Sequence, residues 1–141
     1  MYRAEATAGP VHILRPAAES DLLKELEKYV RDAGINLAWL SGMGAVSRAT
    51  LRYYDQVDHE WDDLQLEQHL EVVNLVGNVS LLNGQPMVHV HVTLSDEEGK
   101  CWGGHLAYDT LVFNMEIMLQ ILSGAVVSRV PDPATGLSLW R

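Results

Sequence analysis

Alternating hydrophobic and polar positions run through most of the chain and predict β-strands. The clearest segment is 87–94, in which three valines and a leucine occupy every second position. The positions between them carry His89 and His91, so both imidazoles point to one face, away from the apolar side. Asn83-Gly84 before this segment favours a tight hairpin, because both residues tolerate positive φ. The run Asp96–Gly99 after it is typical of a second turn.

The same pattern predicts further strands. We expect them at residues 2–7, 11–14, 35–41, 46–54, 66–76 and 101–107, with two short ones in the tail 126–141. Residues 78–82 either continue the strand 66–76 or follow it as a separate one. Between them, Gly42-Met43-Gly44 indicates a tight turn and residues 55–63 a loop. Segment 112–122 divides cleanly by period two, with Phe113 and Ile117 on one face and Glu116 on the other, which favours a strand over a helix.

One amphipathic helix is expected from about Asp21 to Ala33, with Ser20 as its N-cap and Gly34 as its C-terminal stop. No repeat, low-complexity stretch or linker interrupts the chain. The predicted fold class is therefore α+β, with a central, largely antiparallel sheet flanked by one or two helices. We expect a single domain over residues 1–141.

Composition narrows the setting of this fold. At 48% hydrophobic the 141 residues can bury a core, and no apolar run approaches the roughly 18 residues needed to cross a membrane. The first residues lack the pattern of a secretion signal. A single cysteine, Cys101, suits a reducing compartment, so we expect a cytoplasmic protein. The net charge of −9, with no basic run, opposes direct binding to DNA.

A third histidine follows the pair in the next predicted strand. Gly103-Gly104-His105 comes after the second turn, so pairing of the two strands can bring His105 beside His89 or His91. Three neutral imidazoles are a ligand set that zinc takes in proteins. The alternative is that these are ordinary strand histidines bonded to water or carboxylates. The spacing alone leaves both interpretations open.

Other residues extend this hypothesis. Glu116, the one carboxylate in the late apolar segment, is either a further ligand or acid/base beside a metal-bound water, or a solvent-facing strand residue. His69 and Glu71 share a strand face and carry the same two interpretations. His12 and His59 have no partner that the sequence names. The chain contains no phosphate-binding glycine motif and no G-x-S-x-G nucleophile motif.

Several of these motifs together resemble a known family. The run Leu70–Asn78, then Gly84-Gln85-Pro86, His89-Val90-His91-Val92 and Gly103-Gly104-His105-Leu106, with Glu116 beyond them, is similar to the plants-and-prokaryotes conserved (PPC) domain in its prokaryotic stand-alone form. The upstream stretch 34–45 fits as well, so the resemblance covers nearly the whole chain.

The resemblance implies a fold and a function. It implies a central antiparallel sheet, a homotrimer and a metal site at His89, His91 and His105, with zinc or another divalent ion as the cofactor. Family members in plants carry AT-hook segments that bind DNA, while the domain itself mediates assembly. This chain has no AT-hook core, so its expected partners are further copies of itself and other proteins.

A second, looser similarity concerns the cupins. Gly84 to Gly99, with His89-x-His91 and Glu97, resembles the first cupin motif, but the second motif is absent and the helix fits poorly. Two functions stay open. The first is a binding or regulatory module, by resemblance to candidate DNA-binding proteins of the PPC family. The second is a metal-dependent enzyme or small-ligand binder that uses the histidines, with Glu116 as base. The sequence does not decide whether the protein is an enzyme.

Overall fold

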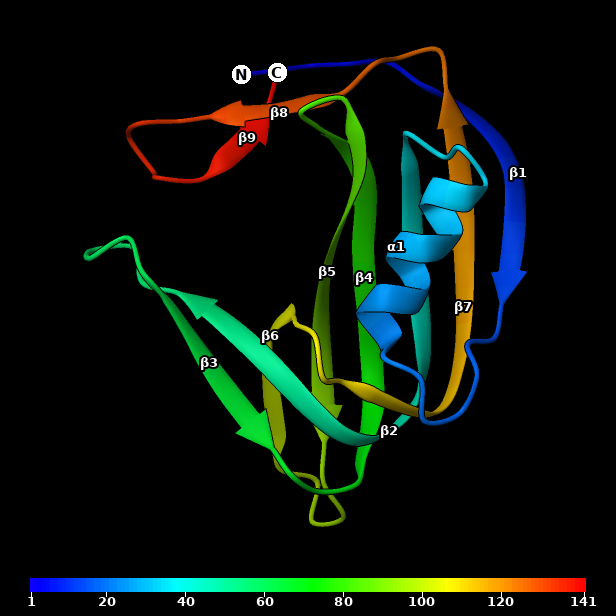
Figure 1. Ribbon diagram of the computed structural model, residues 1–141, viewed down its shortest axis with the longest axis vertical. Helices are drawn as coiled ribbons and strands as arrows, with labels where there is room; N and C mark the ends of the chain where they lie inside the picture. Colours follow the sequence, from blue (N-terminus) through cyan, green and yellow to red (C-terminus); the bar gives the residue numbers. More distant parts are fainter.

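The computed structural model describes residues 1–141, which form one nine-stranded sheet and one helix (Figure 1). The predicted α+β class with a largely antiparallel sheet is confirmed, and the only parallel pair joins β4 to β8. The elements are β1 (Thr7–Leu14), α1 (Leu22–Asp32), β2 (Ala38–Tyr54), β3 (Trp61–Leu66), β4 (Leu70–Leu82), β5 (Gln85–Ser95), β6 (Cys101–Leu106), β7 (Leu111–Ser123), β8 (Ser128–Pro131) and β9 (Ser138–Trp140).

Strand β2 organises the sheet, because its two halves pair with different neighbours. The first half pairs with β4 and β7, and the second half pairs with β3 and β6. Since β4 pairs with β5 and β5 with β6, the ladder β2-β4-β5-β6 returns to β2 and closes a small barrel. This closure gives β4, β5 and β6 a neighbour on each side and sets β6, which carries His105, beside the second half of β2.

The predicted turn at Gly42-Met43-Gly44 is wrong, since these residues lie inside β2. In that strand the glycines are required by packing against β7 and not by a turn. A β-carbon on Gly42 would stand 2.7 Å from the carbonyl oxygen of Glu116 on β7, and one on Gly44 would overlap the carbonyl of Asn114. Gly44 also has φ near +152°, which other residues rarely adopt. The two glycines therefore let β2 and β7 approach closely.

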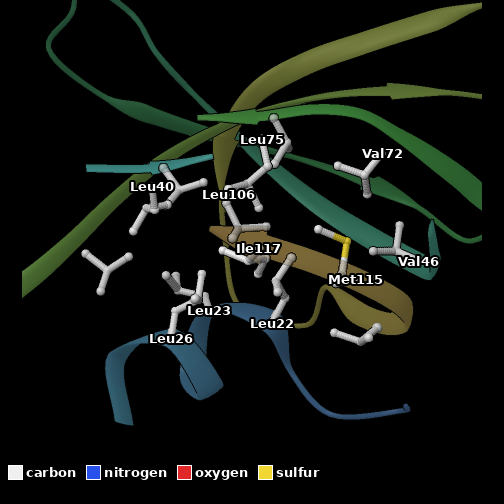
Figure 2. Packing of buried hydrophobic residues seen from close by; sticks show 14 of the residues in the cluster. Leu22, Leu23, Leu26, Leu40, Val46, Val72, Leu75, Leu106, Met115 and Ile117 are labelled. Carbon is white, nitrogen blue, oxygen red and sulfur yellow. The ribbon is translucent and has the colours of Figure 1, made fainter. Parts of the chain in front are cut away.

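The helix is one residue shorter than predicted at each end, and its cap differs. Asp21, not Ser20, is the N-cap, since its carboxylate accepts from the backbone N–H of Lys24. The Ser20 hydroxyl instead donates to the carbonyl of Ala17. Gly34, with φ of 65°, ends the helix as expected. Its buried face packs on the sheet and completes the core (Figure 2).

The core occupies the face of the sheet that α1 covers. It comprises 23 buried residues, among them the alternate positions of β5. Figure 2 shows the helix residues Leu22, Leu23 and Leu26 pointing toward Leu75 and Ile117 from the strands. The alternation that selected the buried face of β5 is confirmed, and it leaves the histidines on the opposite face.

The strand predicted at residues 112–122 is confirmed as β7, but the side chains up to Phe113 point to the opposite face from the one the alternation predicted. Asn114 pairs with Ala45 and Val112 with Val46, so Phe113 is an extra residue in a β-bulge. Val112 is consequently buried, while Phe113 is 64% exposed. The prediction that Phe113 shares the inner face of Ile117 is wrong, because the bulge shifts the alternation by one.

Three further boundaries differ from the sequence-based expectation. No strand forms at residues 2–6, and β1 is a single strand with a bulge between Ala8 and Val11. β4 begins at Leu70 rather than at residue 66, and residues 78–82 continue it, as one of the two alternatives allowed. The expected loop 55–63 is shorter, because β3 begins at Trp61. The two strands of the tail, β8 and β9, are confirmed, and β8 extends the sheet beside β4.

The face of β1, β7 and β2 that points away from the core is apolar and exposed. Met118 on β7 pairs with Ile13 of β1 on one side and with Ser41 of β2 on the other, so their side chains form one row across three strands. The exposed apolar residues of this surface are Val11, Ile13, Trp39, Met43 and Met118. We call it the outer apolar face. The only helix, with 11 residues, is too short to span a membrane.

Candidate metal centre

The three predicted histidines lie together on the outer face of β5 and β6. Antiparallel pairing sets His91 directly opposite His105, and His89 lies two residues earlier on the same face of β5. The ring centroids are 4.0 Å apart for His91 and His105, 5.0 Å for His89 and His105, and 5.2 Å for His89 and His91. One nitrogen from each ring lies within 4.8 Å of the others. The strand pattern therefore predicted the convergence.

The surroundings keep all three imidazoles neutral. Burial, the nearby guanidinium of Arg129 and the two neighbouring rings lower the pKa of His89 to about 4. Burial also lowers the pKa of His91. It lowers the pKa of His105, where His91 acts in the same direction. At neutral pH each ring has a lone pair available for a ligand bond.

The spacing of the three imidazole nitrogens can be compared with the spacing that a zinc ion requires. Two imidazole nitrogens on one tetrahedral zinc ion stand about 3.4 Å apart, given Zn–N bonds of about 2.0–2.1 Å. The nitrogens in this structure lie within 4.8 Å of one another, a separation that small rotations of the three side chains close. Three neutral imidazoles without a carboxylate among them therefore fit a divalent ion with one position left open.

Arg129 of β8 contacts the three-histidine group at His89. Its Nη2 atom lies 3.3 Å from Nδ1 of His89 and donates to Oδ1 of Asn78 at 3.0 Å. Its Nε donates to the hydroxyl of Ser80, and its Nη1 to the carbonyl of Ser138. The guanidinium also lies over the ring of Trp140, 5.7 Å from the centroid. The tail strands therefore reach the histidines through one arginine.

Aromatic residues of the β2–β3 hairpin form the opposite wall. The edge of Trp61 meets His105, with ring centroids 4.9 Å apart, and Tyr54 packs on Trp61 at the same separation. The Tyr54 hydroxyl donates to the carbonyl of Thr135 at 2.7 Å, which ties this hairpin to the β8–β9 turn. In Figure 1 the β8–β9 hairpin lies above the tip of the β2–β3 hairpin, and both lie to the left of β5.

An open hollow of about 690 Å³ is lined by His91 and His105 and, from the two hairpins, by Tyr54 and Thr135. Gly103 and Gly104 line it as well, so no side chain fills the space beside the two imidazoles. A second hollow of about 440 Å³ is lined by His89 and His105. The three histidines thus lie between two solvent-accessible spaces.

The other sequence candidates lie elsewhere. Glu116 is exposed on β7 opposite Met43 of β2, and the structure does not bring it into the histidine group. Along the sheet, β2 and β4 separate β7 from β5, a path of about 14 Å. His69 and Glu71 line a different hollow, near the β5–β6 turn. Glu116 as a base stays a prediction that no contact supports.

The two remaining histidines have local partners. Nδ1 of His12 lies 2.6 Å from the hydroxyl of Tyr29 on the helix. The ring of His59 stacks on Tyr54 at 6.0 Å between centroids. Neither of them belongs to the group formed by His89, His91 and His105.

Sequence reasoning missed two residues of the site. Trp61 was placed in a loop, although its position before an alternating run could have indicated a strand start. Arg129 carries no motif, and it reaches His89 only because β8 pairs with β4 at Leu81 and Leu82. A parallel pairing across 46 residues of intervening chain leaves no local signal.

The family model of the Plants and Prokaryotes Conserved (PCC) domain matches residues 3–123 of the chain. The match includes His89, His91 and His105 and the barrel strands β2, β4, β5 and β6. Arg129 and the strands β8 and β9 lie beyond it.

Solved structures share the whole fold. A metal-containing protein from Archaeoglobus fulgidus is 37% identical with a TM-score of 0.95, covering 100% of this chain and 99% of that one. A plant- and prokaryote-conserved protein from Pyrococcus horikoshii is 34% identical with a TM-score of 0.93, covering 100% and 97%. A candidate DNA-binding protein from Ralstonia eutropha JMP134 is 25% identical with a TM-score of 0.80, covering 96% and 94%.

Two curated relatives are much longer than this chain. Both are bifunctional GlmU proteins, from Synechococcus sp. strains JA-3-3Ab and JA-2-3B'a(2-13), and each is 37% identical over 128 residues. The match covers 89% of this chain but 19% of each relative. The similarity therefore concerns one part of those proteins.

Proposed function

Because the chain belongs to the Plants and Prokaryotes Conserved domain family, we propose that it is a homotrimeric binding or regulatory module whose histidines hold a divalent metal ion, with zinc as the expected ion. The ligands are His89, His91 and His105. A bound ion would supply a Lewis-acidic position open to one further ligand. The single exposed cysteine, Cys101, agrees with a cytoplasmic setting.

The observation that carries the metal proposal is the convergence of three imidazoles with lowered pKa values. Their nitrogens lie within 4.8 Å of one another. The metal-containing protein from Archaeoglobus fulgidus, 37% identical over the full chain, supports the same interpretation.

The outer apolar face supports the trimer. Ile13 is 74% exposed, Met43 is 62% exposed and Met118 is 54% exposed, all on one surface of three adjoining strands. A contiguous apolar surface of this kind favours association with another protein surface. The family resemblance names further copies of the chain as the partner.

Elemental analysis of purified protein tests the metal centre. We expect about one divalent ion per chain in the wild type and a loss of at least tenfold in occupancy in His89→Ala/His91→Ala, since only one imidazole remains. The matched control is His69→Ala, which removes a histidine outside the group and should keep the wild-type metal content. Metal-free wild-type protein after incubation with zinc would contradict the proposal.

A mobility-shift experiment tests the regulatory part. The net charge of −9 makes direct duplex binding unfavourable, so we expect no shift with a random or an AT-rich duplex at low salt. Regulation would then proceed through protein partners. A shift that weakens steeply with added salt would instead show that the chain binds DNA itself, as described for candidate DNA-binding relatives.

The enzyme alternative has less support in the structure. It needs a base beside the ion, and Glu116 lies on β7 outside the histidine group. The three imidazoles and the hollow beside them are compatible with ligand binding and equally with catalysis, so they do not by themselves favour an enzyme. We therefore do not include Glu116 in the proposed site.

A further inference from the structure

We propose that the metal centre binds a small oxyanion, a carboxylate or phosphate group, which reaches the ion on one side and Arg129 on the other. This inference rests on the proposed metal centre and names the class of ligand for its open position. Three features of the structure support it: the charge of Arg129, its contact with His89, and the lining of the hollow.

The charge of Arg129 has no acidic partner. The guanidinium is half-buried, yet it forms no ion pair. Its four polar contacts go to neutral groups, Asn78, Ser80, the carbonyl of Ser138 and His89, and its face lies over the ring of Trp140. The ion pairs of the chain involve other residues. A partly buried cation without an anion is unfavourable, so the site lacks one negative charge. A divalent ion beside it would increase that deficit.

The contact with His89 depends on whether metal is bound. A guanidinium only donates hydrogen bonds, so Nδ1 of His89 must offer its lone pair to Arg129 across the 3.3 Å contact. If an ion takes that lone pair, Arg129 loses an acceptor. If the ion takes Nε2, the neutral ring carries its proton on Nδ1, and two donors face each other. In either case an Arg129 N–H needs a new acceptor next to the ion.

The hollow beside the histidines suits an anion. Its lining includes Arg52 and no acidic residue, although the chain contains 19 aspartates and glutamates. Glu27, Asp63 and Asp109 line the second hollow instead, beside His89, and there Asp63 forms a two-point ion pair with Arg52. Gly103 and Gly104 leave room next to His91 and His105. An oxyanion can therefore approach the three imidazoles from the side of His91 and His105 without meeting a like charge.

Cobalt(II)-loaded protein provides the test, because its visible spectrum changes when an anion enters the coordination sphere. The probes are acetate and inorganic phosphate, titrated at neutral pH. We expect wild-type protein to respond in a saturable way. Arg129→Met should need at least tenfold more of either anion, which corresponds to about 1.4 kcal/mol. Arg31→Met, which removes an exposed helix arginine without contact to the site, should match the wild type.

Metal affinity in anion-free buffer separates this role from a purely structural one. Without the competing and repelling guanidinium, Arg129→Met should bind cobalt as tightly as the wild type or severalfold more tightly, while binding anions more weakly. A variant with a damaged site would bind both more weakly, which would overturn the inference. If Arg129→Met does not fold by circular dichroism, Arg129→Lys replaces it, and at least threefold weaker anion binding is expected.

The outcomes also separate the two proposals. Wild-type protein that binds no metal would overturn the proposed metal centre together with this inference. Wild-type protein that binds metal but shows no anion response overturns the inference alone. An equal anion response in wild type and in the folded Arg129 variant does the same.

Discussion

At the scale of single residues, His89 shows how several weak effects act on one proton. Its ring is partly buried, Arg129 lies 3.3 Å from its Nδ1, and two imidazoles stand about 5 Å away. Each influence disfavours the charged ring, and together they lower its pKa from 6.5 to about 4. A metal ligand gains from this, because protons compete less with the ion in mildly acidic solution.

The lowered pKa also predicts how the metal-free protein responds to acid. Between pH 6.5 and about 4 the unfolded chain binds a proton at His89 that the folded chain does not, so stability falls as pH decreases through this window. We expect a loss of about 2 kcal/mol. The full shift would correspond to about 3 kcal/mol, and solvent screens the exposed part of the ring.

Chemical denaturation of the metal-free protein at several pH values measures this effect. His89→Gln cannot take up the proton and should lose less stability over the same window. His69→Gln, with its exposed side chain outside the group, should retain the wild-type slope. Equal slopes for wild type and His89→Gln would rule out His89 as the source.

At the scale of elements, one glycine fixes the distance between β4 and the strand that carries the histidines. A β-carbon on Gly77 would stand 2.7 Å from a side-chain methyl of Val90 and 3.0 Å from its α-carbon, and would overlap the carbonyl of His89. The backbone of β5 would have to move to admit it. Both the core and the histidine group depend on this close approach.

Gly77→Ala tests this dependence. We expect a loss of about 2 kcal/mol or more in the free energy of unfolding, together with weaker metal binding, because β5 shifts at His89. Thermal or chemical denaturation and a zinc titration measure the two effects. Val73→Ala, on an exposed position of the same strand, should change stability by no more than about 0.5 kcal/mol. Wild-type behaviour of Gly77→Ala would show that the strand tolerates the added group.

The same scale shows what sequence patterns can and cannot predict here. Alternation predicted the strands β5 and β6, and their short turn made the convergence of His89, His91 and His105 a local consequence. The continuity of β2 through Gly42 and Gly44 was missed, because glycines typical of turns here permit close packing against β7. The bulge at Phe113 and the docking of β8 depend on partners distant in sequence, so no local pattern contains them.

At the scale of the whole molecule, the sheet presents two unlike surfaces on the side away from the helix. The outer apolar face covers β1, β7 and the first half of β2, whereas the histidines and Arg129 lie at β5, β6 and β8. The two surfaces share one side of the sheet, so association through the first leaves the second close to the boundary between copies.

A charge placed on the outer apolar face should disrupt the proposed trimer. We expect Met118→Lys to raise the dissociation constant at least about a hundredfold, since assembly would bury an unpaired ammonium group. Native mass spectrometry or light scattering measures the oligomeric state across a range of concentrations. Val57→Lys, at an 87% exposed position in the β2–β3 loop, is the matched control and should remain trimeric. A Met118→Lys trimer as stable as the wild type would place the interface elsewhere.

The strict alternation of β5 has an evolutionary consequence. Positions that stabilise the fold and positions proposed to bind a ligand alternate along a single strand and face opposite sides of the sheet. Mutation can therefore alter or erase the chemistry at the odd-numbered positions while the even-numbered valines preserve the scaffold. Descendants of one ancestor could in this way diverge in ligand and partner without passing through an unfolded intermediate.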